Sequence, residues 1–366
     1  VTPALPQDLA GMALTLVSGS APTSGYTLTA VETSGRHSYL VAFDGAGTTI
    51  RWYRDMGAID VQDAQQQTNG DFTVFVGNTM GNNAAPGAFV ELSPSGDSVR
   101  AITAIGSTYT DGHDIRVQSD ATGKRIADYL FGFDIRNIDE SGYGGATSDP
   151  LAGHQLLRIN ASGTVDTLLQ GWDRWTHADK IDPPVQDQGI DHPNSIDFDL
   201  DGGVIASFRN LGAVVKIDPV TRKVIWQLGG VRNEFTFVGD PLNGFGGQHS
   251  VHVLPNGHLL VFDNGVTHTP QSSRVVEYAL DQTAKTATMV WEYIPSPSMF
   301  NEFTGWVQRL SNGNTIVAWT RYGLIDEVAP DGGLVNRMQL NSTAGVPYLS
   351  TYRMIRIDNL YHYVRP

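Results

Sequence analysis

The chain has 366 residues, of which 40% are apolar, and its 38 acidic against 24 basic side chains give a net charge of −14. This charge opposes non-specific binding to nucleic acid or to an anionic membrane, because both select a basic surface. The chain contains no cysteine, which excludes disulfides and thiolate metal sites, and it has no apolar run long enough to span a bilayer. Its 40 Gly and 18 Pro, spaced between short apolar runs, predict an all-β protein.

The sequence starts at Val1-Thr2-Pro3 rather than at Met. Such a start is typical of a processed protein, so we expect a secreted location, extracellular or periplasmic, with the signal peptide already removed. Asn160-Ala161-Ser162 and Asn341-Ser342-Thr343 fit the N-glycosylation pattern, although chance alone gives about this many triplets in a long chain.

The predicted strands follow a repeating pattern along the chain. Three strands are expected near the N-terminus, at Tyr26–Glu32, Ser38–Phe43 and Thr49–Tyr53. Repeats of an alternating apolar strand, a Gly-containing turn and a second apolar strand then begin near residues 61, 113, 194, 249 and 305. Near the C-terminus, Met354–Asp358 has the pattern of another innermost strand.

One repeat shows a complete blade. Its four short strands are expected at Ser195–Asp199, Gly203–Phe208, Ala213–Asp218 and Lys223–Leu228. Four such strands joined by tight turns make one blade of a β-propeller. The longer spacing before this repeat is occupied by two Gly/Asp-rich insertions, at 136–152 and 171–191.

The repeats predict a single domain over residues 1–366, an all-β, six-bladed β-propeller. Five blades are complete, and the sixth pairs Met354–Asp358 with Tyr26–Glu32, which closes the ring between the terminal strands and leaves no free sheet edge. An open five-bladed ring with loose ends is the alternative.

Polar residues recur where the innermost strands begin. His113, His192, Asn194 and His249 precede or begin first strands, and Arg209 ends a second strand. Positions before a first strand and after a second strand share one mouth of a propeller, so these residues are expected to converge on one site. The alternative is that they only line the channel and bond neighbouring backbone, but three histidines at matching places in three blades argue against it.

Five other histidines are assigned outside this site. His37, His154, His258 and His362 lie at turns or near the terminus and are expected to be solvated, whereas His252 is expected to be a strand residue beside the site. Histidine is a common zinc ligand, so a zinc site is an alternative. No His-x-His pair or carboxylate recurs at the same repeat position, and no metal is therefore expected.

The second insertion contains two tryptophans, Trp172 and Trp175. They are candidate substrate-binding residues that form an aromatic wall for a ring-shaped substrate. They fit equally well as a hydrophobic anchor for the insertion itself, and the sequence leaves both interpretations open.

Five motifs occur in a fixed order between about His113 and Trp319. They are Asp191-His192-Pro193-Asn194-Ser195-Ile196-Asp197, Ser207-Phe208-Arg209, Ala213-Val214-Val215-Lys216-Ile217-Asp218, Trp226-Gln227-Leu228-Gly229-Gly230, and Gln248-His249 followed by Val261-Phe262-Asp263-Asn264-Gly265. In this order they resemble the arylsulfate sulfotransferase family, whose members do not use the nucleotide sulfate donor.

In that family a six-bladed propeller moves a sulfuryl group from one phenol to another by a ping-pong route through a sulfated histidine. The resemblance implies that His249 is the nucleophile, that His192, Asn194 and Arg209 hold the sulfate, and that His113 is the remaining active-site histidine. It implies no cofactor, and its partners are small aryl sulfates and phenols; we expect a monomer. We expect no counterpart of the separate N-terminal β-domain of the bacterial periplasmic members, and the sequence has no cysteine pair, which leaves dimerisation and donor range open.

Two other functions fit the same residues. A polysaccharide lyase would use His as the base and Arg to neutralise a uronate carboxylate. A non-catalytic propeller would bind an acidic glycan at the same place without turnover.

Overall fold

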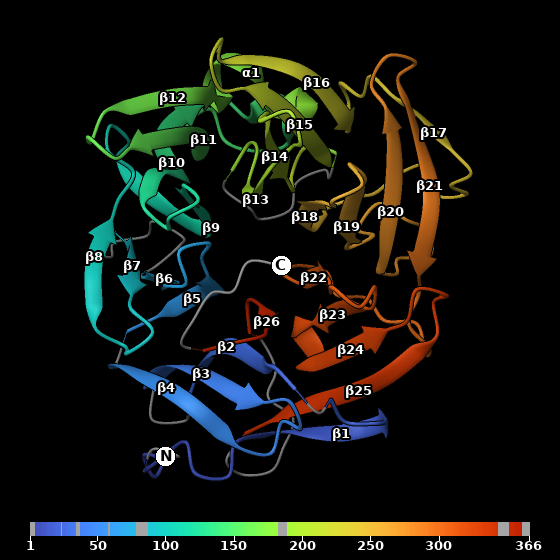
Figure 1. Ribbon diagram of the computed structural model, residues 1–366. Helices are drawn as coiled ribbons and strands as arrows, with labels where there is room; N and C mark the ends of the chain where they lie inside the picture. Colours follow the sequence, from blue (N-terminus) through green and yellow to red (C-terminus); the bar gives the residue numbers. More distant parts are fainter. Residues whose placement is uncertain are drawn as a thin grey trace. The chain divides into compact units, whose positions relative to one another are not determined.

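A computed structural model describes residues 4–22, 24–33, 37–57, 59–77, 87–181, 189–342 and 351–360. Within these residues the strands form six sheets of four or five strands each, and the helices are single turns such as α1 (Gly171–Arg174). Each of the six sheets has at least the four strands of a β-propeller blade, and Figure 1 labels these strands. The predicted all-β fold class is therefore confirmed.

The chain forms two compact units. Unit 1 consists of Val1–Ile102, Ser119–Arg125 and Thr304–Pro366, and unit 2 consists of Thr103–Gln118 and Ile126–Phe303. Each unit contains three of the six sheets. The expectation of one domain over residues 1–366 stays a prediction.

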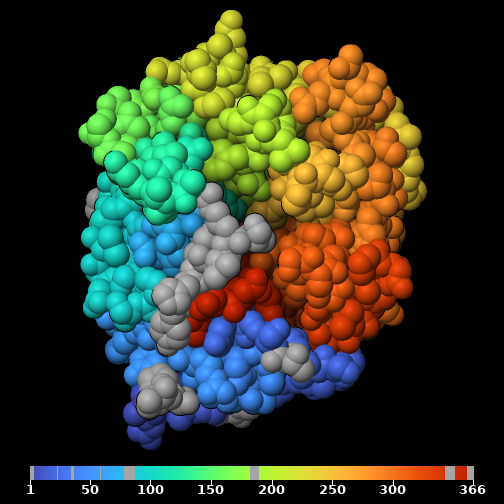
Figure 2. Space-filling view, viewed as in Figure 1, coloured from blue at the N-terminus to red at the C-terminus, as the bar shows by residue number. Residues whose placement is uncertain are grey.

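In unit 1, strands from the two ends of the sequence share a sheet. Its strand order is β26 (Met354–Ile357), β2 (Tyr26–Glu32), β3 (Ser38–Asp44) and β4 (Ile50–Gly57). β26 pairs antiparallel with β2, with Tyr26 opposite Ile357, and Figure 2 shows the red C-terminal strand beside the blue N-terminal strands. The predicted pairing of the terminal strands is confirmed, and the five-bladed alternative is wrong.

The other two sheets of unit 1 contain one strand that sequence analysis missed. The first has the order β1 (Ala13–Gly19), β25 (Leu334–Asn341), β24 (Leu324–Val328), β23 (Thr315–Trp319) and β22 (Trp306–Arg309). The second has the order β5 (Val61–Gln66), β6 (Phe72–Val76), β7 (Ala88–Leu92) and β8 (Ser98–Ile102). The missed strand is β1, in which Leu14 is buried but Leu16 is 45% exposed, so the alternation that marks a half-buried strand is weak.

Unit 2 contains the sheets that carry the candidate site. The first has the order β12 (Val165–Gln170), β11 (Asp149–Asn160), β10 (Arg125–Ile138) and β9 (Tyr109–Ser119). The second has the order β13 (Pro193–Phe198), β14 (Val204–Phe208), β15 (Ala213–Asp218) and β16 (Lys223–Gly229). The third has the order β17 (Thr236–Val238), β21 (Thr286–Tyr293), β20 (Arg274–Asp281), β19 (Leu259–Asp263) and β18 (His249–Val253). The four strands expected for the clearest blade agree closely with β13–β16.

The two predicted insertions differ from expectation. The segment 136–152 is the tip of a long hairpin, because β10 and β11 extend into it with Ile138 opposite Asp149, and a 3-10 turn, Ser141–Tyr143, lies between the two strands. The segment 171–191 contains α1 and a short 3-10 turn, His177–Asp179, while residues 182–188 lie outside the described residues.

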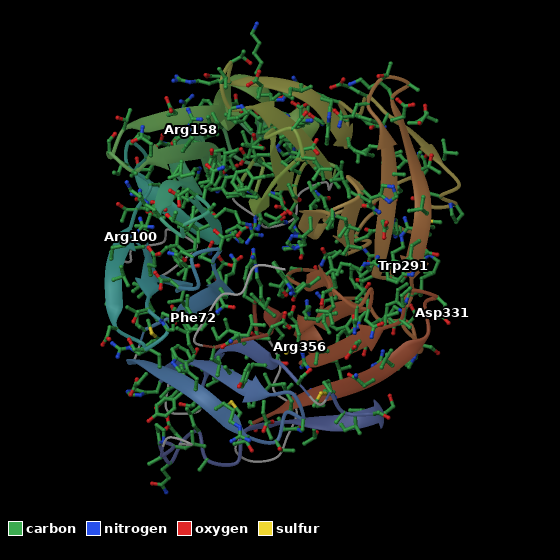
Figure 3. The ribbon with its side chains drawn as sticks, in the orientation of Figure 1. Phe72, Arg100, Arg158, Trp291, Asp331 and Arg356 are labelled. Carbon is green, nitrogen blue, oxygen red and sulfur yellow. The ribbon has the colours of Figure 1, made fainter. Side chains whose placement is uncertain are left out.

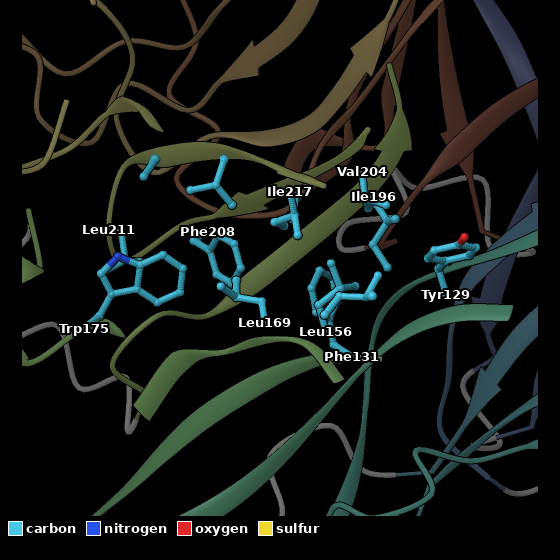
Figure 4. Close-up of a cluster of buried hydrophobic side chains, with 14 of the residues drawn as sticks. Tyr129, Phe131, Leu156, Leu169, Trp175, Ile196, Val204, Phe208, Leu211 and Ile217 are labelled. Carbon is cyan, nitrogen blue, oxygen red and sulfur yellow. The ribbon is translucent and has the colours of Figure 1, made fainter. Parts of the chain in front are cut away.

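The hydrophobic core of unit 2 lies between neighbouring sheets. Figure 4 shows Phe131 and Leu156, from β10 and β11, together with Ile196 and Phe208, from β13 and β14, in one buried cluster. A second cluster joins the β13–β16 sheet to the β17–β21 sheet through Trp226, which is fully buried. Neighbouring blades therefore stabilise each other through apolar burial.

Trp226→Ala is expected to lower the free energy of unfolding by about 3–5 kcal/mol, because it leaves a large cavity between two sheets and removes the hydrogen bond from Nε1 to Oε1 of Gln282. Ile225, the preceding residue on β16, is 46% exposed, so Ile225→Ala is the matched control with an expected change within about 0.5 kcal/mol. Denaturant midpoints measured by tryptophan fluorescence and circular dichroism compare the two variants. Equal midpoints for both would contradict this assignment of the core.

Candidate active site

The innermost strands of two blades in unit 2 are irregular where the polar residues lie. The register of β13 against β14 shifts between Pro193 and Ser195, and that of β18 against β19 shifts between His249 and His252. His192 has a φ of 50°, in the left-handed region that non-glycine residues rarely adopt. Bulges of this kind re-aim side chains, and they set the directions of His192 and His249.

Hydrogen bonds join the inner strands of three neighbouring blades. The Asp114 carboxylate on β9 accepts from the backbone N–H of Ile196 on β13 at 2.7 Å. Ser195 Oγ on β13 accepts from the backbone N–H of Val251 on β18 at 3.1 Å. The start of each inner strand is therefore held at a fixed distance from the next.

His249 is buried and its tautomer is defined by its partners. Its Nδ1 lies 2.8 Å from Oδ1 of Asn264 and 3.2 Å from the carbonyl oxygen of Gly247. Nδ2 of Asn264 donates to the carbonyl oxygen of Asn301, so Oδ1 of Asn264 is an acceptor. Because both partners of Nδ1 are acceptors, Nδ1 carries the proton, and the lone pair of the neutral ring is on Nε2.

The surroundings keep His249 neutral. Burial and the nearby positive charge of Arg209, with smaller contributions from His192 and His113, hold the pKa of His249 well below its usual range. A neutral imidazole is the nucleophilic form. The same interactions place Arg209, His192 and His113 around His249, so the structure brings together the four residues predicted to be catalytic.

Arg209 is buried at the end of β14 and is held by the chain that precedes β13. Its backbone N–H donates to the carbonyl oxygen of His192 at 2.8 Å, and its Nη1 donates to Oδ1 of Asn210 at 3.2 Å. These bonds hold the backbone of Arg209 beside His192 and its guanidinium on Asn210. A preorganised guanidinium suits an anionic group such as a sulfate or a carboxylate.

His113 and His192 lie next to each other. Their ring centroids are 4.6 Å apart. Nδ1 of His113 lies 2.9 Å from both carboxylate oxygens of Asp111, and the backbone N–H of His192 donates to Oδ1 of Asp191 at 3.0 Å. Each histidine therefore has a buried aspartate behind it.

Asn194 lies in β13, two residues after His192. Its Nδ2 donates to the carbonyl oxygen of Gln248 at 2.6 Å. Nε2 of Gln248 in turn lies 3.0 Å from Oγ of Ser207 and 3.1 Å from the carbonyl oxygen of Ala213. Both side chains thus anchor the peptide that precedes His249. The role of Asn194 in holding a sulfate stays a prediction.

The two tryptophans lie beside α1. Trp175 is 2% exposed and belongs to the buried cluster of Figure 4, with its ring centroid 4.7 Å from that of Phe208. Trp172 is partly buried against the same cluster, and the Arg136 guanidinium lies 4.8 Å from its ring. The sequence left two interpretations open, an aromatic wall for a substrate and a hydrophobic anchor for the insertion. These contacts are those of a hydrophobic anchor.

The sequence predicted a solvated His154, and this prediction is wrong. The side chain is buried, with 7% of its surface exposed. The preceding Gly153 suggested a turn at this position, but β11 continues through both residues. Its Nδ1 lies 2.5 Å from Oδ1 of Asp191, and its Nε2 lies 3.4 Å from Oδ2 of Asp111. The side chain therefore lies between two carboxylates behind the site.

The remaining histidines are closer to expectation. The His37 side chain is exposed, and His252 lies within β18 beside the site, as predicted. His258 follows the turn after β18 and is half-buried, with Nδ1 2.7 Å from Oε1 of Glu277. His362 lies outside the described residues.

Sequence analysis missed four residues of this arrangement: Asp111, His154, Asp191 and Asn264. An aspartate shortly before a predicted site histidine, as in Asp111-Gly112-His113 and Asp191-His192, is a signal that the sequence contains for two of them. In the described part of the chain, no group of three or more His, Asp or Glu side chains is arranged to hold a metal ion. No helix among the described residues is long and apolar enough to cross a membrane.

The three sheets of unit 2 carry a site of three histidines and one arginine, of which His249 and Arg209 are buried. Residues 164–335 match the family model described as Arylsulfotransferase (ASST), a stretch that includes His192, Arg209 and His249. The resemblance found in the sequence is confirmed over this stretch, which is similar to the arylsulfotransferase family. No curated protein matches the chain by sequence.

Two solved structures have a similar fold. A Bacteroides caccae protein of unknown function is 13% identical with a TM-score of 0.51, and the match covers 92% of this chain and 100% of that one. The periplasmic gluconolactonase of Pseudomonas aeruginosa is 14% identical with a TM-score of 0.50, and the match covers 92% of this chain and 99% of that one. At these identities the likeness concerns the fold alone.

Proposed function

We propose that the protein transfers a sulfuryl group from an aryl sulfate to a phenol by a ping-pong route through sulfated His249. The observation that carries the proposal is the buried, neutral His249, whose Nδ1 is held by Asn264 and whose pKa is lowered by burial and by Arg209. Its Nε2 is the nucleophilic atom. The match of residues 164–335 to the arylsulfotransferase family supports the same reaction class.

In the first half-reaction, Nε2 of His249 attacks the sulfur of the donor. The N–S bond forms, the S–O bond to the aryl ring breaks, and the phenol oxygen keeps the electron pair and takes a proton from the His113 imidazolium. The ring of His249 becomes positive as the N–S bond forms, and Oδ1 of Asn264 stabilises that charge at Nδ1.

In the second half-reaction, His113 takes the proton of the acceptor phenol. The phenol oxygen attacks sulfur, and the electron pair of the N–S bond returns to Nε2 of His249. His113 is assigned this proton transfer because the Asp111 carboxylate, 2.9 Å from its Nδ1, holds the ring in one orientation.

Arg209 and His192 are assigned to the sulfate oxygens. The sulfuryl group carries negative charge on its oxygens throughout transfer, and a fixed guanidinium in a buried site stabilises that charge without reorganisation. The backbone N–H of Arg209 donates to the carbonyl oxygen of His192, so the two residues that we assign to the sulfate are adjacent. Asn194 then orients the strand that carries His249.

Incubation with a chromogenic aryl sulfate tests the reaction. The expected result is faster release of the first phenol when a second phenol is added, with parallel lines in double-reciprocal plots at several acceptor concentrations, the kinetic signature of a ping-pong route. No phenol release, together with growth of ultraviolet absorbance on uronate-containing polysaccharides, would instead support the lyase. Binding of an acidic glycan without either signal would support the non-catalytic propeller.

A further inference from the structure

A buried chain of alternating charges lies behind His113 and His192. It consists of Asp111, His154 and Asp191, which come from β9, from β11 and from the segment just before β13. His154 bridges the two carboxylates through its two ring nitrogens, at 2.5 Å to Asp191 and 3.4 Å to Asp111. All three side chains are buried.

We propose that Asp111, His154 and Asp191 form a positioning network for the transfer site, in which His154 bridges the two carboxylates so that they hold His113 and His192 in place. The kinetic part of this inference rests on the proposed sulfuryl transfer. The charge state of His154 is a property of the folded chain, so it can be measured without any substrate.

Each aspartate holds a different part of the site. Asp111 accepts from both Nδ1 and the backbone N–H of His113, each at 2.9 Å. Asp191 accepts from the backbone N–H of His192 at 3.0 Å, and its own carbonyl oxygen accepts from the N–H of Asn210 at 3.2 Å. The network thus fixes one histidine directly and the left-handed backbone of the other.

The approach of α1 shows how closely Asp191 is confined. Gly171 begins α1, and a Cβ atom at this position would collide with Oδ2 of Asp191 and with the carbonyl oxygen of His154. Oδ2 of Asp191 also accepts from the backbone N–H of His154 at 3.1 Å. The carboxylate is therefore held on both of its oxygens.

The charges within the network support each other. Burial alone lowers the pKa of an imidazole, but Asp191 and Asp111 outweigh burial and raise the pKa of His154 to about 10. Burial alone raises the pKa of Asp111, but His113 and His154 hold it well below its usual range. Together, one imidazolium and two carboxylates give the network a net charge of −1.

The pH range of this stabilisation follows from the sign of the shift. The ordinary pKa of histidine is about 6.5, and that of His154 is raised to about 10. The stabilising contribution is therefore complete below about pH 6.5 and is lost as the pH rises through about 10. The titratable groups that face His154 are Asp111 and Asp191, with His113 on the far side of Asp111.

His154→Gln tests the positioning role. It leaves two buried carboxylates without the cation between them, and kcat is expected to fall on the order of 100-fold with a much smaller change in KM, as misplaced catalytic groups cause. The double variant His154→Gln/Asp191→Asn removes one carboxylate as well and restores the net charge of −1. It is expected to recover kcat on the order of 10-fold over the single variant.

His258→Gln is the matched control, because it removes another histidine that pairs with a carboxylate, Glu277, at a turn outside the site. Its kcat and KM are expected to stay at wild-type values. An unchanged kcat in His154→Gln, or a double variant no better than the single one, would overturn the positioning role.

A measurement on the wild type separates this inference from the proposed function. Two-bond ¹H–¹⁵N spectra of the histidine-labelled protein, assigned with His154→Gln, are expected to show His154 with both nitrogens protonated at pH 8. If the chain transfers no sulfuryl group, that result still establishes the charged network. A neutral His154 at pH 8 would overturn the network whether or not transfer occurs.

Discussion

His249→Ala is expected to abolish sulfuryl transfer, with a loss on the order of 10⁴-fold or more in kcat, because the variant has no atom to carry the group between the two phenols. His113 and His192 lie nearby. Neither is expected to replace His249 as the carrier. His113 is bound through Nδ1 to Asp111, and the variant has no buried histidine with a fixed tautomer at position 249.

The covalent intermediate is expected on the same residue. Wild-type protein mixed with donor alone and quenched at alkaline pH, where the N–S bond survives, should gain one sulfuryl group on the peptide that contains Gln248-His249-Ser250. His258→Ala is the control, since it removes a histidine of the same blade that lies after the turn and pairs with Glu277. Near-normal turnover by His249→Ala would rule out this histidine as the carrier.

The blades are predictable from the sequence because their signals are local. Alternating apolar residues with a Gly turn, as in the segment that becomes β13 and β14, need only neighbouring residues to be recognised. The pairing of β26 with β2 is also predictable, since an incomplete blade at each end leaves a single way to fill both. β1 is not, because it adds to the outer edge of β25 with few buried side chains.

The candidate site also contains residues that could be predicted from the sequence and residues that could not. His192 and His249 stand where first strands begin, and Arg209 stands where a second strand ends, so the order of the strands is enough to group them. The position of His154 depends on how far β11 extends past Gly153 and on which residues of a neighbouring blade lie opposite. Those are contacts between residues far apart in the sequence, and spacing alone carries no information about them.

The contact of Asn264 with His249 shows what a sequence motif alone does not reveal. The motif Val261-Phe262-Asp263-Asn264-Gly265 contains Asn264 but gives it no role. That role appears only in the structure, where Nδ2 of Asn264 donates to the carbonyl oxygen of Asn301. That bond orients the amide, the amide orients the proton on His249, and the proton decides which nitrogen attacks. A chain of three hydrogen-bonded groups thus turns a motif into a chemical role.

Arg209→Ala is the second variant with a large expected effect. Its guanidinium is buried and fixed by Asn210, and removal of one preorganised donor from a developing anion costs on the order of 100-fold to 1,000-fold in kcat. Arg209→Ala also removes a positive charge that lowers the pKa of His249. The variant is therefore expected to lose activity at acidic pH sooner than the wild type, since its nucleophile is protonated more readily.

Arg209→Lys separates charge from geometry. A lysine keeps the charge but not the planar fork that binds two oxygens, so it is expected to recover only part of kcat while restoring the wild-type pH dependence. Arg158→Ala is the control: Arg158, labelled in Figure 3, pairs with Asp166 across β11 and β12, and its loss is expected to leave both kcat and the pH profile unchanged. Steady-state rates on a chromogenic aryl sulfate between pH 4 and pH 9 compare the variants. If Arg209→Ala kept its kcat and its pH profile, Arg209 would neither stabilise the sulfuryl oxygens nor hold His249 neutral.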